Sequence, residues 1–358
     1  MREEITAVRK FDEKLAAFPR VKLACLPTPL REARDLGKIL KGPRLFLKRD
    51  DLTGLALGGN KSRKLEFIIA DALEKKAGAV VTWGGLQSNW CLQTAVAARL
   101  YGLVPVLILF KPEGLARIEY RGNLLLDRIA GARIEVREIS GPRTSAPRDM
   151  ALSVMDEIAA EVKKSGLNPY TVAVGGSYPG GSMARPLGAL GYFTAFVEIQ
   201  EQMKAAGVER YSLVHASGSG ATQAGLLVAA RACEADCRVV GISVGDPKEE
   251  FSRDVRFIAG ELVDLLGLDL RLEDGDVIVF DDYIGGGYAV FGSREMRVIS
   301  DVTAREGVFL DPVYTAKAMA GFLDLAEKGY FAGDEAVVFL HSGGTATLFA
   351  HGSEILGS

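Results

Sequence analysis

The feature that most constrains the fold is the alternation of short apolar runs with longer amphipathic stretches along the chain. The predicted strands are Leu45–Lys48, Ala79–Trp83, Val104–Phe110, Arg133–Val136, Thr171–Val174, Tyr211–Ala216, Arg238–Val244, Asp276–Phe280 and Ala336–His341. The predicted helices are Lys64–Lys75, Trp90–Tyr101, Asp149–Ser165, Leu187–Ala205, Thr222–Cys233, Phe251–Leu266, Ser293–Glu306 and Thr315–Lys328. Such alternation predicts an α/β fold with parallel sheets whose two faces are covered by helices.

Length and loop composition indicate how the chain is divided. A chain of 358 residues suits two domains or one large α/β unit. The stretch Gly175–Pro186 is rich in glycine and proline, and we expect it to carry the chain from a small domain back to a large one. The predicted large domain comprises residues 1–63 and 176–358, and the predicted small domain comprises residues 64–175. The role of the segment Gly176–Arg185 stays open: it either adds contacts at the ligand site or only extends a loop.

Composition and charge exclude several classes of function. The chain is 48% hydrophobic and 25% charged, and its net charge of −3 gives no broad basic surface for nucleic acid. The first residues, Met1–Ile5, are charged and lack the apolar core of a signal peptide, and no run approaches the ~18 apolar residues of a membrane span. We therefore expect a cytoplasmic enzyme with a small-molecule substrate. Four cysteines without a C-x-x-C pair and only three histidines also make a metal site improbable.

Glycine clusters follow four of the predicted strands. They are Gly84-Gly85, Gly175-Gly176, Gly218 with Gly220, and Gly343-Gly344. In open α/β sheets, ligands bind beyond the carboxyl ends of the strands. One such cluster would be ordinary turn chemistry, because glycine supplies positive φ in any tight turn. Four at equivalent strand ends predict a shared ligand site.

One lysine stands in a glycine-rich frame. Lys61 lies within Gly58–Phe67, between a loop that bends freely and an amphipathic helix. This placement suits one fixed amine that forms a Schiff base with an aldehyde cofactor. Most lysines are solvated surface charges, so the interpretation depends on the neighbouring motifs.

A glycine-rich segment after the strand Tyr211–Ala216 indicates a phosphate site. It reads Ser217-Gly218-Ser219-Gly220-Ala221-Thr222 and opens an apolar helix. Backbone N–H groups at a helix start bind anions, and hydroxyl groups add donors. The dinucleotide fingerprint fails because Gln223 replaces its third glycine, and the Walker pattern fails because Asn60 precedes Lys61. A monophosphate fits better than a nucleotide.

Two further turns open predicted helices. Gln87-Ser88-Asn89 presents amides that suit a carboxylate, although Ser88 or Asn89 as a simple N-cap explains the pattern equally. The run Asp311–Lys317 has a rigid bend at Pro312 and places Tyr314 and Thr315 at a helix start.

Together these motifs resemble those of the pyridoxal-phosphate enzymes that include 1-aminocyclopropane-1-carboxylate deaminase, D-cysteine desulfhydrase and L-cysteate sulfo-lyase. The resemblance extends from about Leu26 to Phe349, and it rests on Leu26–Leu30, Lys48–Asp51, Gly58–Phe67, Gln87–Asn89, Gly218–Gly225, Asp311–Lys317 and His341–Gly344. It implies two domains with open twisted parallel sheets, as in the tryptophan synthase β-subunit class (fold type II), with pyridoxal 5′-phosphate between the domains. It also implies a homodimer.

The resemblance implies a role for each candidate site residue. Lys61 forms the bond to the cofactor and moves protons, and Asn89 bonds the phenolic oxygen of the cofactor. Ser88, with Gln87 and Asn89 beside it, binds the substrate carboxylate, and Tyr288 and Tyr314 line the substrate side. Thr315 contacts the pyridine nitrogen. The phosphate is bound by the segment Ser217, Gly218, Ser219, Gly220, Ala221 and Thr222.

Two positions separate the branches of this family. The deaminases carry Glu at the position of Thr315 and Leu at the position of Ser342. A neutral hydroxyl is expected to leave the pyridine nitrogen unprotonated, which suits β-elimination better than ring opening. We therefore predict a carbon–sulfur lyase that acts on D-cysteine. The second alternative is an L-cysteate sulfo-lyase, and the third is the ring deaminase. A non-catalytic nucleotide-binding protein is the alternative from another class.

One departure concerns the residues after Asn89. Relatives carry a polar residue at the position of Trp90 and Arg at the position of Leu92. These larger, less polar side chains either line the substrate site, which would argue against anionic cysteate, or face the side that packs against other elements.

Overall fold

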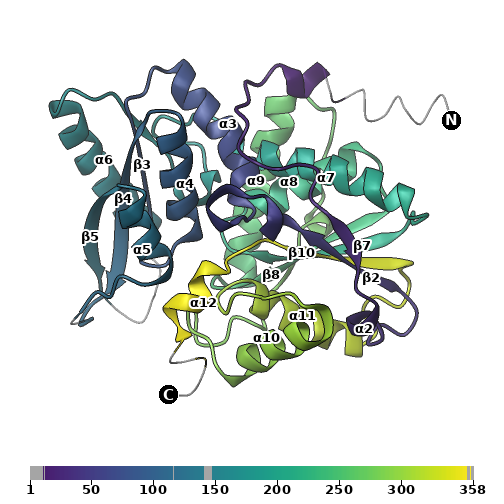
Figure 1. The fold of residues 1–358 in the computed structure, drawn as a ribbon. Helices are drawn as coiled ribbons and strands as arrows, with labels where there is room; N and C mark the ends of the chain where they lie inside the picture. Colours follow the sequence, from purple (N-terminus) through teal and green to yellow (C-terminus); the bar gives the residue numbers. More distant parts are fainter. Residues whose placement is uncertain (1–10, 12, 116, 141–146, 353–354, 356–358) are drawn as a thin grey trace.

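The computed structural model describes residues 11, 13–115, 117–140, 147–352 and 355. Its strands form two sheets (Figure 1). The six-stranded sheet has the order β1 (Leu30–Glu32), β2 (Arg44–Arg49), β10 (Ala336–His341), β7 (Tyr211–Ser217), β8 (Cys237–Ser243) and β9 (Ile278–Phe280). The four-stranded sheet has the order β5 (Arg133–Ile139), β4 (Val104–Pro112), β3 (Ala79–Gly85) and β6 (Pro169–Thr171). Neighbouring strands are parallel except β1, which pairs antiparallel with β2 and was not predicted.

Two predicted strands are displaced. The strand predicted at Thr171–Val174 lies at Pro169–Thr171, because Val174–Gly176 turns as a 3-10 helix in which Gly175 has a φ of 72°. The strand predicted at Asp276–Phe280 begins at Ile278. There the carboxylate of Asp276 accepts the backbone N–H of Glu273 and closes a turn before the strand starts.

The helices agree with the predicted periods to within a few residues. They are α2 (Arg34–Gly37), α3 (Lys61–Glu74), α4 (Asn89–Leu100), α5 (Gly122–Ile129), α6 (Arg148–Lys164), α7 (Leu187–Ala205), α8 (Ala221–Ala232), α9 (Lys248–Leu266), α10 (Ser293–Glu306), α11 (Thr315–Glu327) and α12 (Ala346–Ala350). Of these, α2, α5 and α12 were not predicted. In the described part of the chain, no helix combines the length and the hydropathy that crossing a membrane requires.

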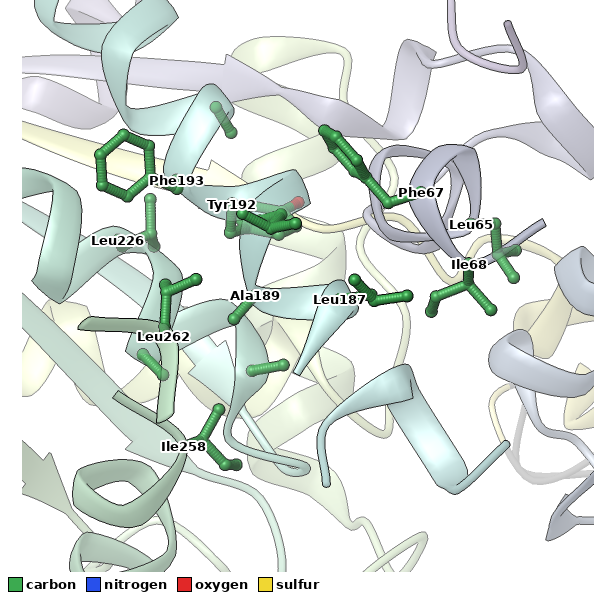
Figure 2. Close-up of a cluster of buried hydrophobic side chains, with 14 of the residues drawn as sticks. Leu65, Phe67, Ile68, Leu187, Ala189, Tyr192, Phe193, Leu226, Ile258 and Leu262 are labelled. Atoms are coloured by element: carbon green, nitrogen blue, oxygen red, sulfur yellow. The ribbon is translucent and has the colours of Figure 1, made fainter. Parts of the chain in front are cut away.

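The large sheet is covered on both faces, as the alternation predicts. Along β10, Val338 and Leu340 belong to the core that contains α7, α8 and α9, whereas Val337 and Phe339 belong to the core on the side of α10 and α11. Figure 2 shows the first core, where side chains of α3, α7, α8 and α9 meet. Burying each large apolar side chain contributes roughly 1.5–3 kcal/mol, so this interface holds α3 firmly against the large sheet.

The strands of the two sheets come from different parts of the chain. Every strand of the four-stranded sheet falls within residues 79–171, and every strand of the six-stranded sheet falls within 30–49 or 211–341. Helix α3 lies at the junction, because its apolar side chains pack in the core beside α7. The division into residues 1–63 with 176–358 and residues 64–175 therefore remains a proposal.

Pairing between distant strands positions the site. β2 and β10 run parallel, and their last partners are Arg49 and His341. The segment after β2 therefore runs beside the segment after β10, where Asn60 N–H donates to the Ser342 carbonyl at 3.0 Å. This contact brings the carboxyl ends of two strands, and Lys61 with them, to one place.

Candidate active site

Lys61 is the first residue of α3, at the point where the glycine-rich loop becomes a helix. Its Nζ donates to Asn60 Oδ1 at 2.7 Å and lies 5.9 Å from the centroid of the Tyr314 ring. Burial lowers the pKa of Lys61 to about 8, and the nearby charge of Asp311 opposes this shift. The neutral, nucleophilic amine is therefore accessible close to physiological pH.

Backbone contacts fix the loop before Lys61. Gly58 has a φ of 79°, and a Cβ there would lie 1.8 Å from the Asp51 carbonyl oxygen, so only glycine fits. Gly59 N–H donates to the Asp50 carbonyl at 2.9 Å, and Gln93 Nε2 donates to the Gly58 carbonyl at 3.0 Å. The lysine thus projects from a rigid support.

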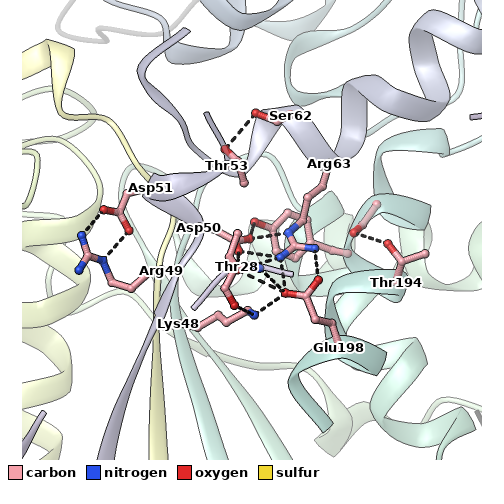
Figure 3. A network of polar contacts seen from close by, with 12 residues as sticks. Thr28, Lys48, Arg49, Asp50, Asp51, Thr53, Ser62, Arg63, Thr194 and Glu198 are labelled. Atoms are coloured by element: carbon pink, nitrogen blue, oxygen red, sulfur yellow. Dashed lines mark hydrogen bonds and ion pairs between the residues drawn. The ribbon is translucent and has the colours of Figure 1, made fainter. Parts of the chain in front are cut away.

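A buried ionic network lies behind the same helix (Figure 3). Arg63, two residues after Lys61, donates to both carboxylate oxygens of Asp50 at 2.9 Å each. It also donates to Glu198 of α7 at 2.8 and 3.0 Å. Arg63 is 1% exposed and Asp50 is 0% exposed. The network therefore ties the start of α3 to the large sheet and to α7.

The predicted phosphate segment forms a tight turn between β7 and α8. Gly220 has a φ of 88° and directly precedes Ala221, the first residue of α8. Thr222 accepts a hydrogen bond from Asn60 Nδ2 at 3.3 Å, which joins this turn to the Lys61 loop. The N–H groups at the start of this twelve-residue helix have no intrahelical acceptors, and such groups suit an anion.

Gln223 explains why the third glycine of a dinucleotide fingerprint is missing. The buried Gln223 accepts from Ser217 Oγ at 2.9 Å and donates to the Ile278 carbonyl at 2.7 Å. The hydroxyl of Ser217 therefore donates to Gln223 and is engaged within the protein. A role of Ser217 toward phosphate stays a prediction.

Sequence reasoning missed a second lysine beside this turn. Lys64 lies one helical turn after Lys61, is fully buried, and donates to the Gly175 carbonyl at 3.3 Å. Burial, and then the charge of Lys61, keep the pKa of Lys64 well below its usual range. Among the described residues no carboxylate lies within ion-pair distance of Lys64, so an anion would suit this position. The i, i+3 spacing from Lys61 is the signal that could have identified it.

Ser88 lies at the start of α4, where the sequence suggested either an N-cap or a residue that binds a carboxylate. It is the N-cap of α4, and its Oγ accepts the Cys91 N–H at 3.2 Å. A Cβ on Gly84 would lie 2.4 Å from Ser88 Oγ, so the end of β3 packs directly against this hydroxyl. The capping role is present, and the helix start beside it retains further N–H groups for a carboxylate.

Asn89 is oriented by Asn123 of α5, a residue that sequence reasoning missed. Asn123 Nδ2 donates to Asn89 Oδ1 at 2.7 Å and to the Gln87 carbonyl at 2.8 Å. Within the described part of the chain the amide nitrogen of Asn89 has no hydrogen-bond acceptor, so it can donate toward a ligand oxygen. Gln87 uses its side chain differently, since it accepts Asn123 N–H and donates to the Arg121 carbonyl. Its predicted contact with substrate remains untested.

Trp90 faces the packing side of α4. Trp90 is 2% exposed and its Nε1 donates to Thr82 Oγ1 of β3 at 2.7 Å. Leu92 is also 2% exposed. The structure therefore supports the packing alternative for Trp90.

Tyr288 and Tyr314 form a pair. Their hydroxyl groups are hydrogen-bonded, and their ring centroids lie 5.7 Å apart at an interplanar angle of 70°. Burial raises the pKa of Tyr288 to about 12 and raises that of Tyr314 well above its usual range. A Cβ on Gly218 would lie 3.8 Å from Tyr314 Cε1, and one on Gly85 would lie 3.9 Å from Tyr288 Cε1. Two protonated phenols thus bridge the end of β3 and the phosphate turn.

Thr315 opens α11 and is held by Asp311. Thr315 Oγ1 donates to Asp311 Oδ1 at 2.8 Å, and the same carboxylate accepts the backbone N–H groups of Val313, Tyr314 and Thr315. Both Thr315 and Asp311 are 0% exposed. Asp311 is a further residue without an assigned role in the sequence reasoning, although its place before Pro312 marks it as a helix-start residue.

These contacts place an amine, a helix start suited to phosphate and two phenols in one connected set. The links are Lys61 to Tyr314, Asn60 to Thr222 and Tyr288 to Tyr314. A phosphorylated aromatic aldehyde presents the complementary groups, so this donor set fits pyridoxal 5′-phosphate.

Comparison with known proteins gives the same family. The family model described as "Pyridoxal-phosphate dependent enzyme" matches residues 21–343. A Pyrococcus abyssi protein that carries the provisional name 1-aminocyclopropane-1-carboxylate deaminase is 37% identical over 347 residues, covering 97% of this chain and 98% of the relative. A D-cysteine desulfhydrase of Yersinia enterocolitica is 38% identical over 345 residues, covering 96% and 98%.

Solved structures agree with the fold. A crystal structure of an ACC deaminase homologue is 36% identical to this chain, covers 97% of it with 98% of its own length, and has a TM-score of 0.86. Threonine deaminase isoform 2 of Solanum lycopersicum, 18% identical with a TM-score of 0.63, shares the fold. These similarities confirm the predicted fold-type-II α/β architecture.

Proposed function

The chain belongs to the family of pyridoxal-phosphate-dependent enzymes, and from this premise we propose that it is a lyase that converts D-cysteine and water to pyruvate, ammonia and sulfide. The observation that carries the proposal is the half-buried Lys61, whose amine has a pKa of about 8 and lies over the Tyr314 ring, next to Asn60, which contacts Thr222. The similarity to D-cysteine desulfhydrases supports the sulfur-bearing substrate.

The residues would hold the cofactor as follows. Lys61 would bind the aldehyde carbon of the cofactor, and the turn Gly218–Thr222 together with Lys64 would bind its phosphate. The amide nitrogen of Asn89 would donate to its phenolic oxygen, and Thr315 would contact its pyridine nitrogen. When bound, this cofactor draws electrons from the α-carbon of the substrate and so makes the α-proton acidic.

The chain's own groups then bind substrate and move protons. The start of α4, with the hydroxyl of Ser88, would hold the substrate carboxylate. The amine of Lys61 would take the α-proton once it is neutral. The carbon–sulfur bond breaks with its electron pair on sulfur, and the Tyr288–Tyr314 pair, protonated at neutral pH, would supply the proton that the sulfur takes.

The choice of D-cysteine over the alternatives depends on Thr315 and Ser342. Thr315 has a neutral side chain, hydrogen-bonded to Asp311, where the deaminases have Glu, and Ser342 lies beside the Lys61 loop through its contact with Asn60. A less electron-withdrawing environment suits elimination of a good leaving group. L-Cysteate sulfo-lyase is the second candidate. The packing of Trp90 against β3 removes the part of the argument against an anionic substrate that rested on Trp90.

A substrate panel tests the proposal. We expect the holoenzyme to release pyruvate and sulfide fastest from D-cysteine, when it is compared with L-cysteine, cysteate, β-chloroalanine and 1-aminocyclopropane-1-carboxylate. Sulfite from cysteate would identify the sulfo-lyase, and a 2-oxo acid from the cyclopropane substrate would identify the deaminase. Turnover of none of them would refute the substrate assignment. A protein that stays colourless with added cofactor would instead favour nucleotide-binding without catalysis.

Replacing Ser88 with alanine separates substrate binding from cofactor binding. We expect turnover to fall by roughly 10²-fold or more while the yellow colour persists, because the cofactor contacts remain. The lost N-cap costs about 1 kcal/mol, which a thermal melt will detect separately. Ser300→Ala, on the exposed side of α10, is the control. Full activity of Ser88→Ala would rule out the carboxylate role.

The lowered pKa of Lys61 predicts how cofactor capture depends on pH. Since only the neutral amine attacks an aldehyde, the rate at which the apoprotein captures cofactor should rise with pH and level off above about 8. Stopped-flow absorbance measures this rate. A rate that keeps rising toward the ordinary lysine pKa of 10.5 would show that Lys61 is not buried as described.

The proposal also includes a setting for the enzyme. We propose a homodimer in the cytoplasm that acts on a free amino acid, with neither nucleic acid nor a membrane as partner. Light scattering of the purified holoenzyme measures the number of subunits directly.

A further inference from the structure

We propose that Ser177 is a phosphate-binding residue of the cofactor site, contributed by the segment that leads from β6 to α7. The inference rests on the proposed function in one respect, since the phosphate is that of the cofactor. Ser177 directly follows the turn Val174–Gly176 and is 0% exposed. It belongs to the segment whose role the sequence leaves open.

Ser177 touches the phosphate turn from a distant part of the chain. Its Oγ donates to Ser219 Oγ at 2.9 Å and accepts the Ala221 N–H at 3.4 Å. Ser219 and Ala221 lie in the predicted phosphate turn, and the Ala221 N–H is one of the donors that a helix start leaves without an intrahelical partner. The Ser177 hydroxyl is bonded to the Ser219 hydroxyl and to the Ala221 N–H, so it is within reach of a phosphate oxygen that these two groups bind.

The backbone before Ser177 is built for this approach. Gly175 and Gly176 have φ angles of 72° and 58°. A Cβ on Gly175 would lie 2.1 Å from Ser219 Oγ, and a Cβ on Gly176 would lie 2.3 Å from Ile68 Cδ1. Side chains at these positions would push the segment away from the turn. The two glycines therefore explain how Ser177 comes close to Ser219 and Ala221.

Charge at the same place favours an anion. Lys64 Nζ donates to the carbonyl of Gly175, two residues before Ser177. Lys64 is fully buried, and burial keeps its pKa well below the usual range, so a nearby dianion would stabilise its charged form. Lys64, Ser177, Ser219 and the Ala221 amide thus surround one region with hydrogen-bond donors from three separate segments. This is the combination of hydroxyl, amide and ammonium donors that binds phosphate.

The alternative is that Ser177 only caps α8 and fixes the loop. A capping role predicts equal effects on ligands with and without phosphate, whereas a phosphate-binding role does not. Pyridoxal, which has the aldehyde and ring but no phosphate, is therefore the matched probe for pyridoxal 5′-phosphate.

The test measures the affinity of the apoprotein for both compounds by absorbance titration. For Ser177→Ala we expect affinity for pyridoxal 5′-phosphate to fall at least about 10-fold, as for the loss of a hydrogen bond to a charged group, and affinity for pyridoxal to be unchanged. Ser177→Cys is nearly isosteric and should behave in the same way if the alanine variant is unstable. Ser182→Ala, in the same segment but bonded to Thr171, should bind both compounds like wild type.

Each outcome is decisive. Equal losses for the two compounds, or no loss for either, would overturn the role of Ser177 while leaving the proposed function intact. If wild-type apoprotein captured neither compound at Lys61, the proposed function itself would fail. Selective loss of the phosphorylated compound in both Ser177 variants would establish the contact.

Discussion

Replacing Lys61 with alanine is expected to abolish the yellow colour of the cofactor-loaded enzyme and to lower turnover by roughly 10²- to 10⁴-fold. Lys61 is the half-buried amine that lies over the Tyr314 ring, and its pKa of about 8 suits both bond formation and proton transfer. The variant should still fold, because Lys61 Nζ has a single hydrogen bond, to the neighbouring Asn60. Absorbance spectra and pyruvate release measure the two effects.

The matched control is Lys75→Ala at the other end of α3. Lys75 is exposed and makes a surface ion pair with Asp71, so its loss should change neither colour nor turnover. A Lys61→Ala protein that kept wild-type colour and rate would remove the basis of the proposed chemistry.

The largest effect on stability is expected from Arg63→Met. The change removes the cation that pairs with Asp50 and Glu198 and leaves two carboxylates without their main partner. Breaking a buried pair in this way typically costs about 3–5 kcal/mol. Urea denaturation at neutral pH, followed by circular dichroism, measures the free energy of unfolding. Arg44→Met, which breaks an exposed pair with Glu32, should cost less than about 1 kcal/mol.

The pH dependence of this difference follows from the two carboxyl groups. Burial raises their pKa values, but Arg63 and then Lys48 outweigh burial, so the pKa values of Asp50 and Glu198 lie below their ordinary 3.8 and 4.5. The stabilisation is complete above the ordinary values and is lost as pH falls through the lowered ones. The gap between wild type and Arg63→Met should therefore shrink below pH 3.8. A gap that does not depend on pH would show that charge pairing is not its cause.

The long helices, in which apolar residues recur over several turns, could be predicted from the sequence. The predicted bounds of α7 and α10 are both correct, because α10 buries one apolar face over several turns and α7 is a long apolar run that is buried all round in its first two turns. Helix α5 was missed because it has only eight residues, and Leu125 and Ile129 on it are exposed. The strand at Pro169–Thr171 was predicted too late in the chain, at Thr171–Val174, because apolar residues continue up to Val174, where the 3-10 turn begins.

The site was predictable where one segment supplies both the residue and its setting. Lys61 and the turn before α8 are of this kind, because glycine and helix start are neighbours in the sequence. Asn123 was not predictable, since its contact with Asn89 joins residues 34 positions apart. Nor could the sequence decide which side of α4 carries Trp90, because that depends on the position of Thr82 in β3. Such contacts arise only when separate elements pack.

The most direct measurement is reduction of the holoenzyme with borohydride, followed by peptide mapping. The reduction makes the bond between cofactor and protein permanent, so the modified peptide identifies the amine that holds the cofactor. We predict a single cofactor-bearing peptide with the modification on Lys61. Modification of Lys64 or any other lysine, or recovery of unmodified protein alone, would contradict the account.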